Sequence, residues 1–538
     1  MEIIQLSSLA KVFENKIYGD RADSLLLVKG QSAAYQIALM GEGEYTFSLN
    51  SEISDYINVY KVGYVPSELP AYETANDDNY LTLEPCNFPD PLFPVEDNKI
   101  TLEKEKYLTL WMDLNIPEDA KVGAFSVEFT LVSAENVKSS AVFNIEIKDI
   151  TLPSPDITVT QWFHTDCIAN VHGVEVFSPE HWELIEKYIA MASSGGINMI
   201  LVPVLTPPLD TEVGGERRTV QLAKVERTEK GYAIDLSRLE RFIDICLRNK
   251  IKFFEINHFF TQWGAKCTPK VIATVNGEEK RIFGWETPST SPEYKEFLEA
   301  LVPKIIATFE SKGIDKSRLY FHVSDEPSNN NIDNYRAAAD VILPLVKGCN
   351  HTDALSHFDF YQQGLVPTPV VAVDAIEPFL EAGVEKLWCY YCCAQARDVA
   401  NRFMAMPSAR NRIIGTQIYK YGIKGFLHWG YNFYNSQFSK YEIDPYKVTD
   451  AGKAFPSGDA FSVYPYKDGV IPSLRFRVFK QALCDVALLK LLEKKIGKEN
   501  AVALIDRVAN TDITFKKYPR NESFFAELYE EIINELEK

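Results

Sequence analysis

The segment "SPEHWELIEKYIAMASSGGINMILVPVL", residues 178–205, joins a helix to a strand and contains the pattern on which the central fold depends. Ser178 is a favourable N-cap residue, Pro179 suits the first helical position, and the glycine pair that starts at Gly195 ends the helix. The run that follows, 198–205, is short and apolar and is typical of a strand. A helix that leads into a strand in this way is one unit of an alternating strand and helix fold.

This alternation continues over eight predicted strands. Similar glycine stops precede later strands in "SKGIDKSRLY", "EAGVEKLWCY" and "KYGIKGFLHW". The predicted strands are 157–164, 198–205, 252–259, 318–324, 353–359, 370–375, 386–392 and 425–431. Eight strands joined by helices in a segment of this size favour a closed (β/α)8 TIM barrel over an open sheet.

The two ends of the chain follow other patterns. Early segments such as "YQIALMG", "YLTLWMDLNI" and "AVFNIEIKDI" alternate apolar and polar residues, with turn-forming residues between them, which predicts a β-sandwich. The linker "DITLPSPDIT" and the helical sequence after Pro472 divide the chain into a sandwich at 1–152, a catalytic barrel at 153–470 and a helical extension at 471–538. We expect the C-terminal helices to pack on the barrel.

The composition limits the classes of partner. A chain of 538 residues, 46% of them hydrophobic, exceeds what one core supports and predicts a multidomain globular protein. The formal net charge of -19 argues against nucleic acid or an anionic membrane as a partner and fits a neutral substrate, although acidity also serves solubility alone. The sequence does not indicate an oligomeric state.

The cysteines and the N-terminus bear on location. Nine cysteines are too few for a disulfide scaffold and favour a reducing compartment. The N-terminus "MEIIQLSSLAKVFENK" has no signal-peptide pattern, and no run of 18 apolar residues occurs. We therefore expect a cytoplasmic protein without membrane insertion, although a secreted protein trimmed of its signal peptide would look the same.

Two adjacent carboxylates, Asp325 and Glu326, follow the fourth predicted strand in "HVSDEP". The active sites of TIM barrels lie at the C-terminal ends of the strands. A carboxylic acid that stays protonated can donate to a leaving oxygen, and a neighbouring carboxylate raises its pKa in the required direction. The alternative is a turn whose acid caps the next helix, which Ser328 or Asn329 would do equally well.

Histidines and aromatic residues gather in the same strands and the loops after them. They are His164, His258, His322, His357, His428, Trp263, Trp285, Trp388, Tyr390, Tyr391, Trp429 and Tyr431. Flat aromatic faces edged by hydrogen-bonding groups suit a pyranose ring, while any one of them taken alone is more often a core residue than a ligand contact. The long loops 206–233 and 260–292 lie on the same face and would wall a pocket.

Motifs for other chemistries are absent. The first strand reads "FHTD" rather than HxH, and the chain contains no HExxH, so we expect no metal and no cofactor. The CxxC formed by Cys389 and Cys392 has no second pair and is interpreted as strand packing. No Walker A, GxGxxG or GxSxG motif occurs, which argues against nucleotide and serine-hydrolase chemistry.

The barrel resembles the bacterial domain-of-unknown-function family 4091, which is related to the catalytic domain of glycoside hydrolase family 123. The matching motifs lie between about residues 217 and 466 and are "RTVQLAKVE", "FTQWGAKCTPKV", "FGWET", "FHVSDEP", "GFLHWGYNFYNSQ" and "PSGDAFSVYP". The segment "LWMDLNIPEDAKVGAFSVEFTL" is similar to the sandwich that precedes such barrels.

The resemblance implies a retaining exo-glycosidase that removes terminal β-linked N-acetylgalactosamine, or another N-acetylhexosamine, from a glycan or glycoconjugate. The 2-acetamido group of the substrate acts as the nucleophile in that family. By the same resemblance, Glu326 is the general acid/base and Asp325 orients the acetamide. Further substrate contacts are assigned to His258, Trp263, Tyr390 or Tyr391, Trp429, Asn432 and Asp459.

Two alternatives remain open at this point. A glycosidase for a sugar without an acetamido group would need a carboxylate nucleophile about 5–5.5 Å from Glu326. The candidates in or just after predicted strands are Asp166, Glu255, Asp359 and Asp374. The other alternative is a non-catalytic glycan-binding protein that uses the same pocket.

Overall fold

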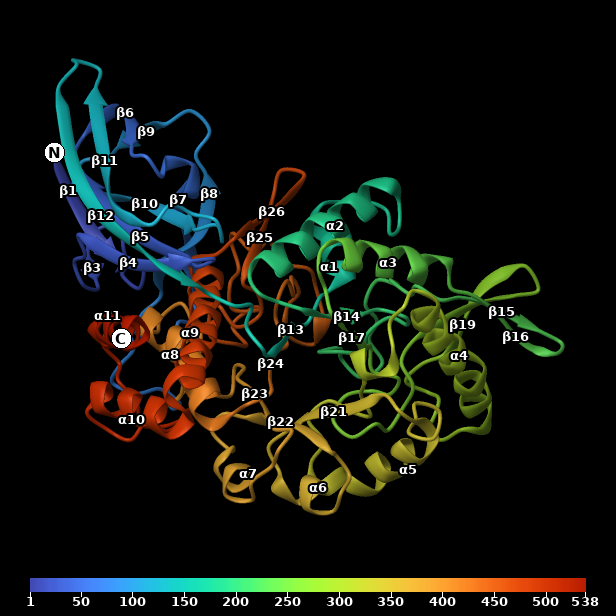
Figure 1. Cartoon of the computed structure of the whole chain (residues 1–538). Helices are drawn as coiled ribbons and strands as arrows, with labels where there is room; N and C mark the ends of the chain where they lie inside the picture. The colour runs from blue at the N-terminus through green and yellow to red at the C-terminus, as the bar shows by residue number, and fades with distance from the viewer.

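The computed structural model describes all 538 residues and contains two N-terminal sheets, a closed eight-stranded barrel and C-terminal helices. In Figure 1 the sandwich occupies the upper left, the C-terminal helices lie below it and the barrel lies to the right. This arrangement confirms the predicted fold class. None of the helices has an apolar stretch that would carry it across a lipid bilayer.

The N-terminal domain is built from two five-stranded sheets. The first has the order β1 (Glu2–Ser7), β5 (Ser32–Met40), β10 (Tyr107–Asn115), β7 (Ile57–Ser67) and β8 (Cys86–Pro94). The second has the order β4 (Ser24–Lys29), β12 (Lys138–Thr151), β11 (Gly123–Ser133), β6 (Gly43–Asn50) and β9 (Lys99–Leu102). The sheets share a core in which the rings of Tyr35 and Phe143 stack at 3.7 Å. A hairpin of β2 (Lys11–Val12) and β3 (Ile17–Tyr18) lies beside them.

The sequence did not reveal all of these strands. In β8, "CNFPDPLFP", three prolines hide the strand, and they are tolerated because β8 is the last strand of its sheet.

The barrel is closed by parallel pairing of β24 with β13. Its strands are β13 (Thr158–Gln161), β14 (Met199–Val202), β17 (Phe253–Ile256), β20 (Leu319–Phe321), β21 (Asn350–Leu355), β22 (Thr368–Ala372), β23 (Trp388–Tyr390) and β24 (Gly425–His428). All eight predicted strands are present. The fifth was predicted too late in the chain, because "FDFYQ" forms the short helix α6 (Phe358–Gln362) instead. The sixth begins before its predicted start because Pro369 lies inside it.

Helices cover the outside of the barrel. They are α1 (Thr165–Val171), α2 (Pro179–Ser194), α3 (Ser237–Arg248), α4 (Pro292–Ser311), α5 (Ile332–Ile342), α6, α7 (Glu377–Glu381) and α8 (Ser408–Tyr421). Ser178 caps α2 as its sequence indicates, by accepting a hydrogen bond from the backbone of His181 at 3.2 Å.

The helix α9 (Leu474–Ile496) follows β24 and packs directly on α8. Gly415 of α8 makes this close approach possible, because a Cβ atom there would lie 2.2 Å from the carbonyl oxygen of Ala482. The predicted boundary after residue 470 therefore separates the barrel from a helix that completes it, and we propose to place the boundary after Ile496. The helices α10 (Lys498–Ala509) and α11 (Ser523–Glu537) follow.

The long insertions after β14 and β17 are partly ordered as strands. The hairpins β15 (Lys224–Thr228) with β16 (Gly231–Asp235), and β18 (Val271–Val275) with β19 (Glu278–Phe283), combine into one four-stranded sheet. Trp285 also joins the insertions, by donating to the carbonyl of Gly215 at 2.9 Å. A further hairpin, β25 (Val463–Tyr466) with β26 (Gly469–Pro472), precedes α9.

A buried ion pair connects the sandwich to the barrel. Arg475 of α9 donates two hydrogen bonds of 2.8 Å to Asp90 of β8, and both side chains are at most 2% exposed. Arg475 also donates to the carbonyl oxygens of Gly458 and Phe461 at 2.6 and 3.0 Å. The sandwich thus holds the long loop that follows β24.

Asp90→Ala leaves the guanidinium of Arg475 buried without its charge partner, so we expect the free energy of unfolding to fall by about 3–5 kcal/mol. Chemical denaturation measures this change. Glu96→Ala removes the exposed partner of Lys467 and serves as the control, with an expected loss below about 1 kcal/mol. Equal losses in the two variants would contradict the assigned role of the buried pair.

Candidate active site

The Asp325–Glu326 pair lies just beyond β20, at the C-terminal rim of the barrel. Asp325 is half-buried and Glu326 is exposed. Glu326 has a φ of 43°, a left-handed conformation that costs a glutamate roughly 1–3 kcal/mol. Its N–H donates to the carbonyl of Ala354 in β21 at 3.1 Å, which helps to hold this conformation.

The two carboxyl groups interact electrostatically. Burial and the neighbouring charge of Glu326 raise the pKa of Asp325 well above its usual value, while the charge of His322 opposes this shift. Two like charges this close favour sharing a proton between them. Burial and this neighbouring charge thus favour the protonated form of Asp325.

Of the two tyrosines at the end of β23, Tyr390 faces the acid pair. Its hydroxyl donates to Oε1 of Glu326 at 2.7 Å. The hydroxyl of Tyr391 instead donates to Asn411 of α8 at 3.3 Å, and its ring packs against Phe426. This orientation could not be read from the sequence, because successive residues of a strand point to opposite faces and the register was unknown.

Trp263 lies beside the acid pair on the loop after β17. Its backbone N–H donates to the carbonyl of Asp325 at 2.9 Å, and its own carbonyl accepts from Asn331 at 2.8 Å. The indole remains 44% exposed. Its ring centroid lies 5.9 Å from that of Phe438, and the two rings are arranged edge to face. A large aromatic face is thus fixed in position and open to solvent, as stacking on a ligand requires.

Trp429 and Asp459 form a second unit. The indole N–H of half-buried Trp429 donates to Oδ2 of Asp459 at 2.8 Å. Burial raises the pKa of Asp459 to about 7, against the charge of Arg402 and the bond from Trp429. Its Oδ1 has no hydrogen-bond partner and lies 3.4 Å from Nε2 of His428.

The thiol of Cys392 is influenced by both this unit and the acid pair. Its neighbour Cys393, burial and the charges of Glu326 and Asp459 together raise the pKa of Cys392 well above its usual value. The charges of both carboxylates thus act on this thiol.

The remaining predicted contacts, His258 and Asn432, are both buried. Neither ring nitrogen of His258 has a hydrogen-bond partner, and its ring stacks on His322 at 4.2 Å. The amide of Asn432 accepts from the backbone N–H of His164 at 2.9 Å and donates to its carbonyl at 3.0 Å. Asn432 therefore fixes the loop after β24 to the end of β13.

Two acidic residues near the pair, Asp353 and Asp210, were not identified from the sequence, and Glu255 was considered there only as an alternative nucleophile. Glu255 and Asp353 flank His322 inside the barrel, and Asp210 belongs to the loop after β14. Oδ2 of Asp210 accepts from the backbone of Phe438 at 3.0 Å, and burial raises its pKa to about 6. No motif marks Asp210, whereas the apolar strands around Glu255 and Asp353 carried a signal in the form of a charged residue inside a buried run.

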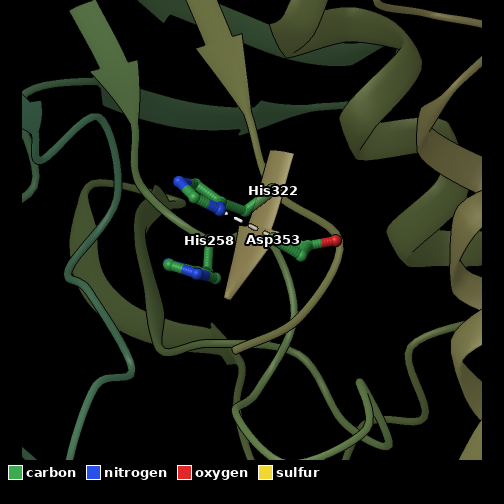
Figure 2. A group of neighbouring side chains, drawn as sticks. All are labelled: His258, His322 and Asp353. Carbon is green, nitrogen blue, oxygen red and sulfur yellow. Dashed lines mark hydrogen bonds and ion pairs between the residues drawn. The ribbon is translucent and has the colours of Figure 1, made fainter. Parts of the chain in front are cut away.

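His258, His322 and Asp353 come close enough to suggest a metal site (Figure 2). His322, however, bonds to Glu255 at 2.7 Å and to Asp353 at 3.3 Å, one through each ring nitrogen. Burial would lower the pKa of His322, but these bonds and charges raise it to about 10. Both ring nitrogens of His322 are thus engaged by carboxylates, and the group forms a buried ion-pair network.

The four candidate nucleophiles differ in availability. Asp166 is buried and receives two hydrogen bonds from Arg217, at 2.6 and 2.8 Å. Glu255 accepts from Thr160, Trp162 and His322, each at 2.7 Å. Asp359 is exposed on α6 next to Asn329, and Asp374 is exposed and accepts from Gln395 at 3.0 Å. Internal bonds thus already engage Asp166 and Glu255.

A barrel with an acid pair and exposed or half-buried tryptophans at its C-terminal rim is the arrangement of a glycoside hydrolase. Residues 162–492 match the family model "Glycoside hydrolase 123, catalytic domain", which covers more than half of the chain. The chain belongs to this family and is a glycoside hydrolase, so the predicted resemblance to family 123 is confirmed. The relation to domain-of-unknown-function family 4091 stays a prediction.

One solved structure agrees with this fold over almost its whole length. A family 123 glycoside hydrolase from Clostridium perfringens matches with a TM-score of 0.73 and 14% identity over 99% of this chain and 97% of that chain. A family 5 xyloglucanase from Bacteroides ovatus matches over 86% of this chain and 98% of that chain, with 11% identity and a TM-score of 0.30, which is too low to support an inference. No curated protein matches the sequence.

The pKa of Asp459, about 7, exceeds that of an aspartate in an unfolded chain, so the folded state retains a proton that the unfolded state releases. The associated stability is fully present below about pH 4 and is lost as the pH rises through about 7. Relative to Asp459→Asn, the free energy of unfolding of the wild type should fall by on the order of 1 kcal/mol per pH unit across this window. Denaturant titrations from pH 4 to 8 measure it.

Asp97→Asn changes an exposed carboxylate and is the control for this titration. It should follow the wild type at every pH. If Asp459→Asn also follows the wild type, Asp459 is not held protonated by burial.

Proposed function

We propose that this protein is a retaining exo-glycoside hydrolase that removes terminal β-linked N-acetylgalactosamine, or another N-acetylhexosamine, by substrate-assisted catalysis. The observation that carries the proposal is the adjacent pair Asp325 and Glu326, with the hydroxyl of Tyr390 bonded to Glu326 at 2.7 Å. An acid pair of neighbouring residues suits a mechanism in which one carboxyl group protonates the glycosidic oxygen and the other acts on the adjacent 2-acetamido group.

In the first step, protonated Glu326 gives its proton to the glycosidic oxygen, and the bond from that oxygen to the anomeric carbon breaks. The carbonyl oxygen of the 2-acetamido group forms a bond to the anomeric carbon from the opposite side. Asp325 accepts the acetamide N–H and stabilises the positive charge of the resulting oxazolinium ring. The aglycone leaves as an alcohol.

In the second step, Glu326 takes a proton from a water molecule, and the oxygen of that water attacks the anomeric carbon. The bond to the acetamide oxygen breaks, which restores the acetamido group and the original configuration. Tyr390 is suited to donate to the acetamide carbonyl once substrate replaces its bond to Glu326.

The sugar ring would lie against Trp429, whose indole is oriented by Asp459 at 2.8 Å. The unpaired Oδ1 of Asp459 is an acceptor for a sugar hydroxyl, and Trp263 supplies an open aromatic face at the entrance. His258 offers unpaired nitrogens deeper in the barrel. Tyr391 and Asn432 are engaged elsewhere and are not part of the proposed sugar contacts.

The substrate class follows from chemistry and from one relative. The net charge of -19 fits a neutral sugar better than an anionic one. The structure of the Clostridium perfringens enzyme was determined to describe glycolipid glycan hydrolysis. We propose a glycan carried by a glycoconjugate as the substrate here.

The second candidate is a glycosidase for a sugar without an acetamido group. It is favoured by one observation, the exposed carboxylate of Asp374 just after β22, which would serve as the nucleophile. Such an enzyme would lose activity in Asp374→Asn and would accept galactosides as well as their N-acetyl counterparts.

A panel of aryl β-glycosides separates the candidates. We expect the wild type to hydrolyse N-acetylgalactosaminides, with kcat/KM lowered about 10²–10⁴-fold in Glu326→Gln and about 10²–10³-fold in Asp325→Asn. Asp340→Asn, at an exposed carboxylate of α5, is the matched control and should keep wild-type rates. Hydrolysis that survives both acid-pair substitutions, or that requires Asp374 instead, would sink the assignment.

A further inference from the structure

His322 stands between two carboxylates inside the barrel. It follows β20, while Glu255 lies on β17 and Asp353 on β21, so three neighbouring strands supply the three side chains. The exposed fractions of His322, Glu255 and Asp353 are 1%, 0% and 0%. In Figure 2 the bond from His322 runs to Asp353, and the ring of His258 lies beneath it. A histidine enclosed by two carboxylates in this way carries a positive charge.

Asp353 connects this charge to the acid pair. Besides His322, it accepts from the backbone N–H groups of Val323 and Ser324, at 3.1 and 3.2 Å from Oδ1. These two residues immediately precede Asp325. The same carboxylate thus holds the charged ring and the backbone turn from which the acid pair projects.

Further hydrogen bonds hold the carboxylate of Asp353 in position. Its Oδ2 accepts from the hydroxyl of Tyr335 on α5 at 2.6 Å and interacts with Nε2 of His351 at 3.1 Å. Glu255 is similarly fixed by Thr160 and Trp162, both at 2.7 Å. Every partner of the ring is therefore anchored to a barrel strand, a strand end or a helix.

We propose that His322, held as an imidazolium by Glu255 and Asp353, is a positioning residue for catalysis: it fixes the turn that carries Asp325 and Glu326 and keeps a positive charge close to Asp325. The inference rests on the proposed roles of the acid pair. It explains why a buried cation stands three residues before two carboxyl groups that must take different protonation states.

The charge has a direct consequence for the reaction. Asp325 must be ionised to accept the acetamide N–H while Glu326 keeps the proton that it will donate. Burial and Glu326 both raise the pKa of Asp325, and His322 acts in the opposite direction. The imidazolium therefore favours the ionised form of Asp325, which the proposed mechanism requires.

The groups that face His322 define what can titrate with it. They are Glu255 on β17, His258 after β17, Asp353 and His351 on β21, Tyr335 on α5 and Asp325 on its own loop. Among these, burial and the charge of His322 lower the pKa of His258 well below its usual value, so its ring is neutral at pH 7. The bonds and charges of His322 and His351 overcome burial and lower the pKa of Asp353, which stays ionised.

The test combines carbon-13 NMR of labelled aspartate and histidine with pH profiles of kcat and KM on an aryl N-acetylgalactosaminide. The variants are His322→Gln and Glu255→Gln, the second of which keeps an acceptor for His322 while removing a charge. We expect the acidic limb of the kcat profile, and the titration of Asp325, to move up by about one pH unit in His322→Gln. The KM should change less than kcat.

His181→Gln is the control, because His181 is a buried histidine of α2 that bonds to the Thr165 carbonyl at 3.1 Å, away from the acid pair. It should keep the wild-type profile. If His322→Gln fails to fold, the wild-type protein still decides the proposal. A His322 ring that is neutral at pH 7, or an Asp325 titration unchanged in Glu255→Gln, overturns it.

The proposed function and the proposed role of His322 can be contradicted separately. A wild type without activity on acetamido sugars contradicts the proposed function, whereas the NMR titrations of His322 and Asp325 do not depend on the substrate. An unchanged Asp325 titration in an enzyme that does hydrolyse these sugars overturns only the role of His322.

Discussion

The positive charge of His322 inside the barrel is the constraint to which its surroundings are matched. A TIM barrel normally fills its interior with apolar side chains, and an isolated charge there is strongly unfavourable. Here β13, β17 and β21 supply Thr160, Glu255 and Asp353, which form a polar layer around the ring. His322 follows β20 directly and is continuous with the turn that carries the acid pair. The polar layer inside the barrel is therefore linked to the geometry of its rim.

The sandwich is also part of the active-site framework. Its loop between β7 and β8 contacts the barrel, where Asp77 accepts two hydrogen bonds from buried Arg410 at 2.8 and 2.9 Å. Tyr72 of the same loop donates to the carbonyl of Ala454 at 3.2 Å, a few residues before Asp459. Arg475, paired with Asp90, holds the backbone on either side of Asp459. The position of Asp459 thus depends on residues from both domains.

Much of the fold could be predicted from the sequence because helix caps, glycine stops and apolar strands are local signals. The position of Asp325 and Glu326 followed from the same signals, since a strand end fixes the rim. The partners of His322 could not be predicted in the same way. Glu255 precedes His322 by 67 residues and Asp353 follows it by 31, and no local pattern pairs them. The choice between Tyr390 and Tyr391 needed the register of β23, which only the closed barrel supplies.

The central claim is that the acetamide of the substrate attacks the anomeric carbon while Glu326 donates the proton. The measurement that tests it most directly is kcat/KM for aryl N-acyl-β-galactosaminides whose acetyl group carries zero, one, two or three fluorine atoms. Fluorine withdraws electrons from the carbonyl oxygen and weakens it as a nucleophile. The account predicts that kcat/KM falls steeply with each fluorine, and rates that do not depend on fluorine would contradict it.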